Sequence, residues 1–99
     1  MKKKEESKTV KVDFTRVMVE VEYDEFKEVD LHKVVGNNIH KGCADLEIDE
    51  IGRAVFREGA ADIPVEYIND IRAIIQSSPL VFAYRMAVLA LLPKQITED

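Results

Sequence analysis

The segment formed by residues 80–92 constrains the fold of this chain most, because Arg85 is its only charged side chain. It follows Ser78 and Pro79 and ends before Pro93. This arrangement predicts a helix with Ser78 as its N-cap and Pro79 at its first position. A helix that is apolar on every side must be buried on more than one of them. We therefore expect this segment to be the central buried helix of the fold.

The extra apolar face of this helix can be covered in two ways. The same residue types line the core of a subunit and the interface between subunits, so the sequence leaves both open. We expect a homo-oligomer. The candidate interaction surface on this helix consists of Phe82, Arg85, Met86 and Leu89.

Length and composition are typical of one globular domain. The 99 residues are 46% hydrophobic and 33% charged, which favours a single modest core. We expect residues 9–93 to form the domain, between a flexible basic tail at 1–8 and a flexible tail at 94–99. Cys43 is the only cysteine, so an internal disulfide is excluded and a reducing compartment, the cytoplasm, is expected.

No segment is typical of export or of membrane spanning. The basic residues 2–4 begin like a signal peptide, but no apolar run follows them. Residues 80–92 are too short to cross the ~30 Å apolar layer of a bilayer as a helix. We expect no export signal and no membrane partner.

Alternating apolar and polar residues predict strands at the start of the domain. Val10, Val12 and Phe14 occupy even positions, whereas odd positions hold Val17, Val19, Val21 and Tyr23. This change of phase requires a turn at residues 15–16 or a bulge. A second turn is expected at residues 23–26. We predict at least two antiparallel strands, with their register open.

Helical spacing of apolar residues predicts the rest of the chain. A first helix is expected over 31–41 with Asp30 as its cap, and Gly36 within it marks a close backbone contact. A second helix runs from Leu46 to its stop at Gly59. Residues 60–63 form a connector or a minor edge strand, and a third helix follows from Pro64. The fold class is therefore α+β, with a small antiparallel sheet of two or three strands packed against about four helices.

Polar residues around the first helix do not form a recognisable catalytic or metal motif. A metal site could draw on His32, His40, Cys43 and Asp45, but structural zinc sites use paired ligands such as CxxC, which the chain lacks. Cys43 follows a helix, so it lacks the helix N-terminal position that activates thiols. We expect no enzyme, no metal and no cofactor. One polar cluster has no assigned role; it consists of Asn37, Asn38 and His40. We favour the interpretation that its asparagine amides form hydrogen bonds inside the fold over the interpretation that the cluster is a binding site.

The charge distribution disfavours nucleic acid as a partner of the folded part. Residues 13–30 hold seven carboxylates against Arg16 and Lys27 within a net charge of −5. An alternative function is a nucleic-acid-associated regulator that uses the basic arm Lys2–Lys4. A salt-sensitive gel shift that is lost when residues 1–8 are deleted would support this alternative.

Two runs of residues carry a resemblance to a known group of proteins. They are Val29-Asp30-Leu31-x-Lys33-Val34-Val35-Gly36-Asn37-x-Ile39 and Ile48-Asp49-Glu50-Ile51-x-Arg53. Over residues 17–92 the order of elements resembles small proteins encoded by bacterial phages and prophages, whose role is unassigned. The resemblance implies a cytoplasmic bacterial or phage setting and a non-enzymatic accessory task. The expected function is protein–protein interaction in phage-related assembly or regulation.

Overall fold

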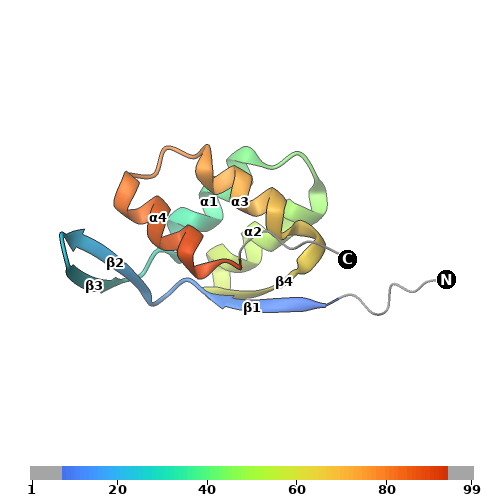
Figure 1. The fold of residues 1–99 in the computed structure, drawn as a ribbon. Coiled ribbons are helices and arrows are strands. Elements are labelled where there is room, and N and C mark those ends of the chain that lie inside the picture. Colours follow the sequence, from blue (N-terminus) through green and yellow to red (C-terminus); the bar gives the residue numbers. More distant parts are fainter. Residues whose placement is uncertain (1–7, 94–99) are drawn as a thin grey trace, which may run out of the picture.

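The computed structural model describes residues 8–93, in which two short sheets accompany a layer of helices (Figure 1). In chain order the elements are β1 (Thr9–Asp13), β2 (Val17–Glu22), β3 (Glu25–Val29), α1 (His32–Gly42), α2 (Leu46–Glu58), β4 (Ala60–Pro64), the 3-10 helix η2 (Val65–Tyr67), α3 (Ile68–Gln76) and α4 (Phe82–Leu91). The predicted α+β class with about four helices is confirmed, and the sheet component has four strands among the described residues.

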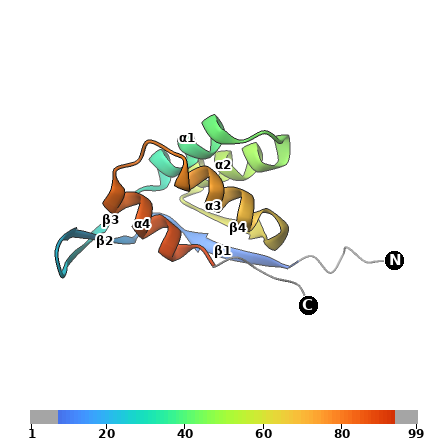
Figure 2. The ribbon, with the colours of Figure 1, turned by 45° about the horizontal axis from the view of Figure 1, so that its top comes forward.

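The strands form two separate antiparallel pairs. β1 pairs with β4, from Thr9 opposite Pro64 to Asp13 opposite Ala60. β2 and β3 form a local hairpin that begins with Val17 opposite Val29. Figures 1 and 2 show the β1–β4 pair running along the helices, while the hairpin lies at the other end of the molecule, beside α4.

The apolar residues change from even to odd positions between Phe14 and Val17 because the chain leaves β1 of one sheet here and enters β2 of the other. The Asp13 carboxylate accepts hydrogen bonds from the Thr15 backbone N–H at 2.9 Å and from the Thr15 hydroxyl at 2.6 Å. An aspartate that bonds two residues ahead in this way closes a local turn. A turn, and not a bulge, therefore redirects the chain here. The second expected turn is confirmed at Tyr23 and Asp24, where Asp24 has a φ of 64°.

Two glycines allow α1 and α2 to pack closely. A Cβ atom added at Gly36 would lie 2.7 Å from the Phe56 Cβ and 2.8 Å from the Gly52 carbonyl oxygen. A Cβ added at Gly52 would lie 2.8 Å from Ile39 Cγ2. The expected close backbone contact at Gly36 is confirmed. The predicted stop of α2 is confirmed as well, because Gly59 ends it in the left-handed conformation with a φ of 84°.

The core draws side chains from both sheets and all four α-helices. Its fully buried large members are Phe14, Ile39, Ile63, Ile68, Ile71, Ile75, Val17, Val19, Val35, Val55 and Val88. Most of them come from α1, α3 and the strands, and only Val88 comes from α4. The structure therefore places the centre of the core away from α4.

The prediction of residues 80–92 as the central buried helix is wrong. α4 lies at one side of the helical layer, beside the hairpin, and buries only Val88 and Leu89 of its own residues (Figure 2). Phe82 and Met86 remain 69% and 48% exposed. An all-apolar helix has no polar face to mark its outer side, so the sequence cannot reveal that one side is left uncovered.

The predicted start of this helix is also wrong. The Ser78 hydroxyl donates to the Ile75 carbonyl oxygen at 2.7 Å, which closes the end of α3 and leaves no cap for α4. The chain then runs extended to Val81, whose ψ is 154°, and α4 begins at Phe82. Pro64 likewise does not begin a helix, because it is the last residue of β4, and η2 precedes α3.

Two arginines hold the ends of α4 in place. Arg85 Nη1 donates to the Leu80 carbonyl oxygen at 2.8 Å, in the extended segment before the helix. Arg72 Nη1, from α3, donates to the carbonyl oxygens of Leu89 at 2.9 Å and of Pro93 at 3.1 Å. Carbonyls at a helix C-terminus lack partners within the helix, so a guanidinium satisfies them well. No helix within residues 8–93 is both long enough and apolar enough to cross a membrane.

Candidate functional site

An apolar groove of about 760 Å³ lies between α4 and the β2–β3 hairpin. Its lining residues come from these three elements and the turn of the hairpin: Met18, Glu20, Val21, Glu22, Tyr23, Glu25, Phe26, Phe82, Ala83, Met86, Ala87 and Ala90. Large apolar side chains stand open to solvent here, with Phe82 69%, Phe26 59% and Met18 54% exposed. We call this feature the α4–hairpin groove.

The local fold explains why these side chains remain uncovered. Val17 and Val19 of β2 are buried in the core, but Val21 lies within the irregularity between Glu20 and Glu22 and is about half exposed. The distal half of the hairpin therefore extends past the edge of the core. α4 has no polar side to turn toward the opening, so Phe82 and Met86 line it.

Three carboxylates, which we call the acidic rim, line the hairpin side of the groove. They are Glu20, Glu22 and Glu25, and none of the residues that line the groove is lysine or arginine. One of them is held in place, because Glu20 Oε2 accepts a hydrogen bond from the Asp24 backbone N–H at 2.8 Å. The groove thus combines apolar side chains with the acidic rim.

The predicted interaction surface is only partly located in this groove. Phe82 and Met86 line it, as expected for a contact surface. Leu89 is 8% exposed and belongs to the core, so its inclusion is wrong. Arg85 is half-buried, because its guanidinium bonds the carbonyl oxygens before α4 and lies 6.0 Å from the centre of the Phe82 ring.

The hairpin side of the groove was not predicted. Val21 was identified only as a member of an alternating strand and Phe26 only as part of the turn at residues 23–26, while Met18 was given no role. The signal that could have identified them is the pairing of β3, in which Phe26 lies opposite Glu20 and Lys27 lies opposite Val19. A strand that places a phenylalanine on the same side as a glutamate leaves that aromatic ring near water.

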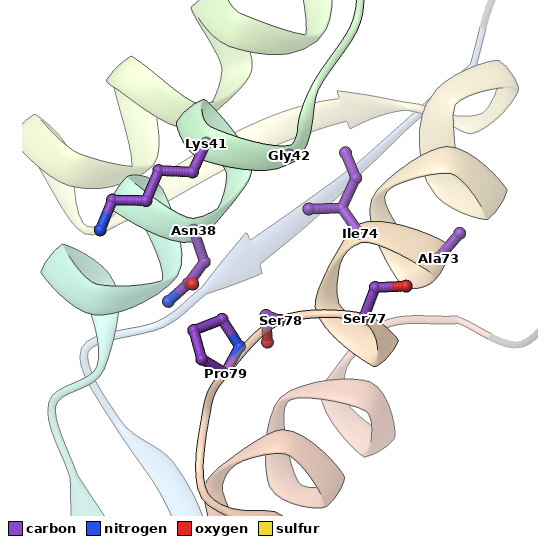
Figure 3. A pocket seen from close by; sticks show the side chains of 8 residues that line it. All are labelled: Asn38, Lys41, Gly42, Ala73, Ile74, Ser77, Ser78 and Pro79. Carbon is purple, nitrogen blue, oxygen red and sulfur yellow. The ribbon is translucent and has the colours of Figure 1, made fainter.

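The predicted polar cluster on α1 is not one site. Asn37 and His40 line a small hollow between α1 and α2, whereas Asn38 lines a different cavity of about 370 Å³ against the end of α3. Figure 3 shows the Asn38 side chain pointing toward Ser78 and Pro79, while Lys41 extends away from them. The Asn38 amide donates to the Val34 carbonyl oxygen at 2.8 Å and is 8% exposed. It is the buried, internally bonded amide that the sequence favoured.

His40 and Cys43 both lie near one carboxylate, that of Asp49. His40 Nδ1 donates to Asp49 Oδ1 at 2.6 Å, and the Cys43 thiol lies 3.8 Å from the same oxygen. The hydrogen bond from His40 is the main cause of the lowered pKa of Asp49. Burial, followed by the negative charge of Asp49, raises the pKa of Cys43. Since only a thiolate is a good nucleophile, this arrangement disfavours the reactive form of Cys43.

The other residues considered for a metal site are separated from this group. His32 Nδ1 bonds the Asp30 carboxylate at the start of α1, and Asp45 is exposed before α2. Within residues 8–93, no three His, Cys, Asp or Glu side chains are placed to hold a metal ion together. Residues 1–7, including the basic arm Lys2–Lys4, and the expected tail at 94–99 lie outside the described part of the chain.

Comparison with protein-family models, with curated proteins and with solved structures finds no match for this chain.

Proposed function

We propose that this protein is a non-enzymatic protein–protein interaction module that binds its partner through the α4–hairpin groove. The observation that carries this proposal is the gathering of exposed Phe26, Phe82 and Met86 in one hollow. Apolar side chains clustered at the surface favour association with another protein, and methionines adapt well to the shape of a partner. The raised pKa of Cys43 supports the non-enzymatic part of the proposal.

We also propose that the protein forms a homo-oligomer in the cytoplasm and acts as an accessory or assembly component of a phage or prophage. The support for self-association is the uncovered side of α4, which no other described element shields. The support for the phage setting is the sequence resemblance over residues 17–92.

The first test is the absolute molar mass of the protein by size exclusion with light scattering at several concentrations. The expected mass is a multiple of the 11.3 kDa of one chain. The double variant Phe82→Asp/Met86→Glu places charges in the groove and should reduce the mass to that of one chain. Circular dichroism verifies that the variant remains folded.

A matched control for these charges is Leu46→Glu, because Leu46 is 71% exposed at the start of α2, outside the groove. This variant should keep the wild-type mass. A groove variant that keeps the wild-type mass would contradict the use of the groove, and a wild-type mass of 11.3 kDa at every concentration would contradict self-association.

A further inference from the structure

We propose that the α4–hairpin groove binds the outer face of α1 and α2 on a second copy of this chain, so that copies associate head to tail. This inference rests on the proposed function and deepens it by naming the surface that fills the groove. It is argued from the charge and the apolar character of two surfaces that share no residue.

The α1–α2 face presents one aromatic side chain among cations. Phe56 of α2 is 37% exposed, and the Lys33 ammonium from α1 lies 5.8 Å from the centre of its ring. Arg53 lies three residues before Phe56 and Arg57 directly after it, and both are exposed. We call these four residues the basic α1–α2 face.

The acidic residues of the two helices leave this face positive. α1 contains no aspartate or glutamate. Asp49 of α2 accepts a hydrogen bond from His40 and lies 3.8 Å from Arg53, so Asp49 and Arg53 offset each other and the surplus positive charge comes from Lys33 and Arg57. The three glutamates of α2 line a different hollow, beside β4; they are Glu47, Glu50 and Glu58.

The two surfaces are complementary in charge and in apolar character. The groove combines apolar side chains with the acidic rim of Glu20, Glu22 and Glu25, whereas the basic α1–α2 face combines Phe56 with Lys33, which lies over its ring, and with the exposed Arg53 and Arg57. Opposite charges across an interface favour correct partners and orientation. Joining two grooves symmetrically would instead bring the three glutamates of each copy into one interface whose lining holds no lysine or arginine, and like charges disfavour that contact.

The placement of the surfaces determines the type of assembly. They belong to different elements, so each copy offers one groove and one basic face. A contact between unlike surfaces leaves one of each unoccupied at the two ends. It therefore continues until a ring closes or an open chain forms.

The test uses charge reversal on each surface, with light scattering as the measurement. Glu22→Lys/Glu25→Lys makes the groove rim positive, and Arg53→Glu/Arg57→Glu makes the α1–α2 face negative. Each variant alone then opposes like charges, and we expect the mass to fall to 11.3 kDa with an association at least about tenfold weaker.

Mixing the two variants in equal amounts should restore association, with the two variants alternating in the assembly. The positive groove of one variant faces the negative α1–α2 face of the other, and the remaining pair of surfaces has the wild-type charges. A matched control is Glu47→Lys/Glu58→Lys, which makes the same change of charge outside both surfaces and should leave the mass unchanged. Added salt should weaken association of the wild type.

The outcomes separate the two proposals. If Phe82→Asp/Met86→Glu is a single chain in solution while Arg53→Glu/Arg57→Glu keeps the wild-type mass, the groove is used but its occupant is another surface, which overturns this inference alone. If the mixture of charge variants stays at 11.3 kDa, the head-to-tail contact is overturned as well. A wild type that is a single chain at every concentration overturns this inference together with self-association.

Discussion

At the scale of single residues, the surroundings of Cys43 decide its chemistry. Its thiol lies at the end of α1, near the carboxylate of Asp49 and 3.5 Å from the carbonyl oxygen of His40. Desolvation is the main cause of its raised pKa, and the charge of Asp49 adds to it. A raised pKa means that a smaller fraction of the thiol is ionised at any given pH than in a free cysteine. The histidine beside it acts on Asp49 and does not deprotonate the thiol.

This environment predicts slow alkylation of Cys43 by iodoacetamide. The apparent pKa from the pH dependence of the rate should be higher in the folded protein than in the same chain in denaturant. Asp49→Asn removes the nearby negative charge, so it should lower the apparent pKa and speed the reaction at neutral pH. The rate should remain below that of the denatured chain, because desolvation persists in the variant.

A matched control for that variant is Asp70→Asn, which removes a carboxylate that is not among the causes of the shift at Cys43. The apparent pKa of Cys43 in this variant should equal that of Cys43 in the wild type. An apparent pKa for native Cys43 at or below the denatured value would contradict the assignment of an inactive thiol and reopen the question of catalysis.

At the scale of elements, the crossing of α1 and α2 depends on backbone-to-backbone contact. Gly36 and Gly52 face each other, and the atoms around the missing Cβ of Gly36 belong to the Phe56 Cβ and backbone. These atoms cannot rotate away as the end of a long side chain could. The crossing also places Lys33 of α1 beside Phe56 of α2, so it builds the basic α1–α2 face.

Gly36→Ala should therefore destabilise the fold despite the better helix propensity of alanine. Alanine gains about 1 kcal/mol in a helix interior, but overpacking against a rigid neighbour costs about 1–3 kcal/mol, and contacts of 2.7–2.8 Å place this site at the upper end. We expect a net loss of about 1–2 kcal/mol of unfolding free energy in urea titrations.

Asn37→Ala, at the exposed neighbouring position, provides the comparison. It should be neutral or slightly stabilising, since nothing packs tightly on this residue and alanine is the better helix former. Equal stability of Gly36→Ala and the wild type would show that the two helices can separate at little cost.

Elements in which apolar residues recur at a regular spacing were predictable from the sequence, and elements without such a spacing were not. α2 has its apolar stripe and a glycine stop, so both of its ends were expected within a residue. α4 has apolar residues on every side, so the sequence predicted a helix but not which of its sides faces the core. It therefore could not tell that Leu89 is buried and Phe82 is exposed. The Ser78-Pro79 pair matched a helix start, yet the Ser78 hydroxyl serves the preceding helix.

At the scale of the whole molecule, the two sheets differ in how strongly they are held. The β1–β4 pair contributes Val12 and Ile63 to the core. β3, in contrast, exposes its residues 25–28 and pairs only with β2 among the described strands. A hairpin that packs little apolar surface is stable only where it rests on other elements. β2 buries Val17 and Val19 in the core, so only the distal part of the hairpin, residues 21–28, lacks such support. We therefore expect this part to open at a lower free energy than the β1–β4 pair.

Native-state hydrogen exchange should reveal this difference. Backbone amides of residues 21–28 should exchange through local opening, faster than those of β1, β4 and α1 by orders of magnitude. Measurement by NMR or by mass spectrometry of peptides resolves these segments. Because this part of the hairpin also lines the groove, the amides should become more protected at concentrations where the protein associates. Uniform protection across all strands in the single-chain state would contradict the prediction.

The separation into two sheets could not be derived from the sequence. Local alternation identified strands, and Tyr23-Asp24 identified the turn of the hairpin, because both signals lie within a few residues. The partner of β1 is β4, a short segment that local patterns left as a connector or an edge strand. The groove was missed for the same reason, since its two walls, Phe26 and Phe82, come from distant parts of the chain.

The pairing of β1 with β4 determines the order in which this chain acquires its structure. All of residues 14–59 lie between the first contacts of the two strands, Asp13 with Ala60. The hairpin and the α1–α2 pair need only local loop closure, whereas β1 must wait for a segment that is synthesised much later. During translation β1 leaves the ribosome well before β4, so we expect β1 to be paired after the β2–β3 hairpin has formed, with its edge exposed to other nascent chains until then.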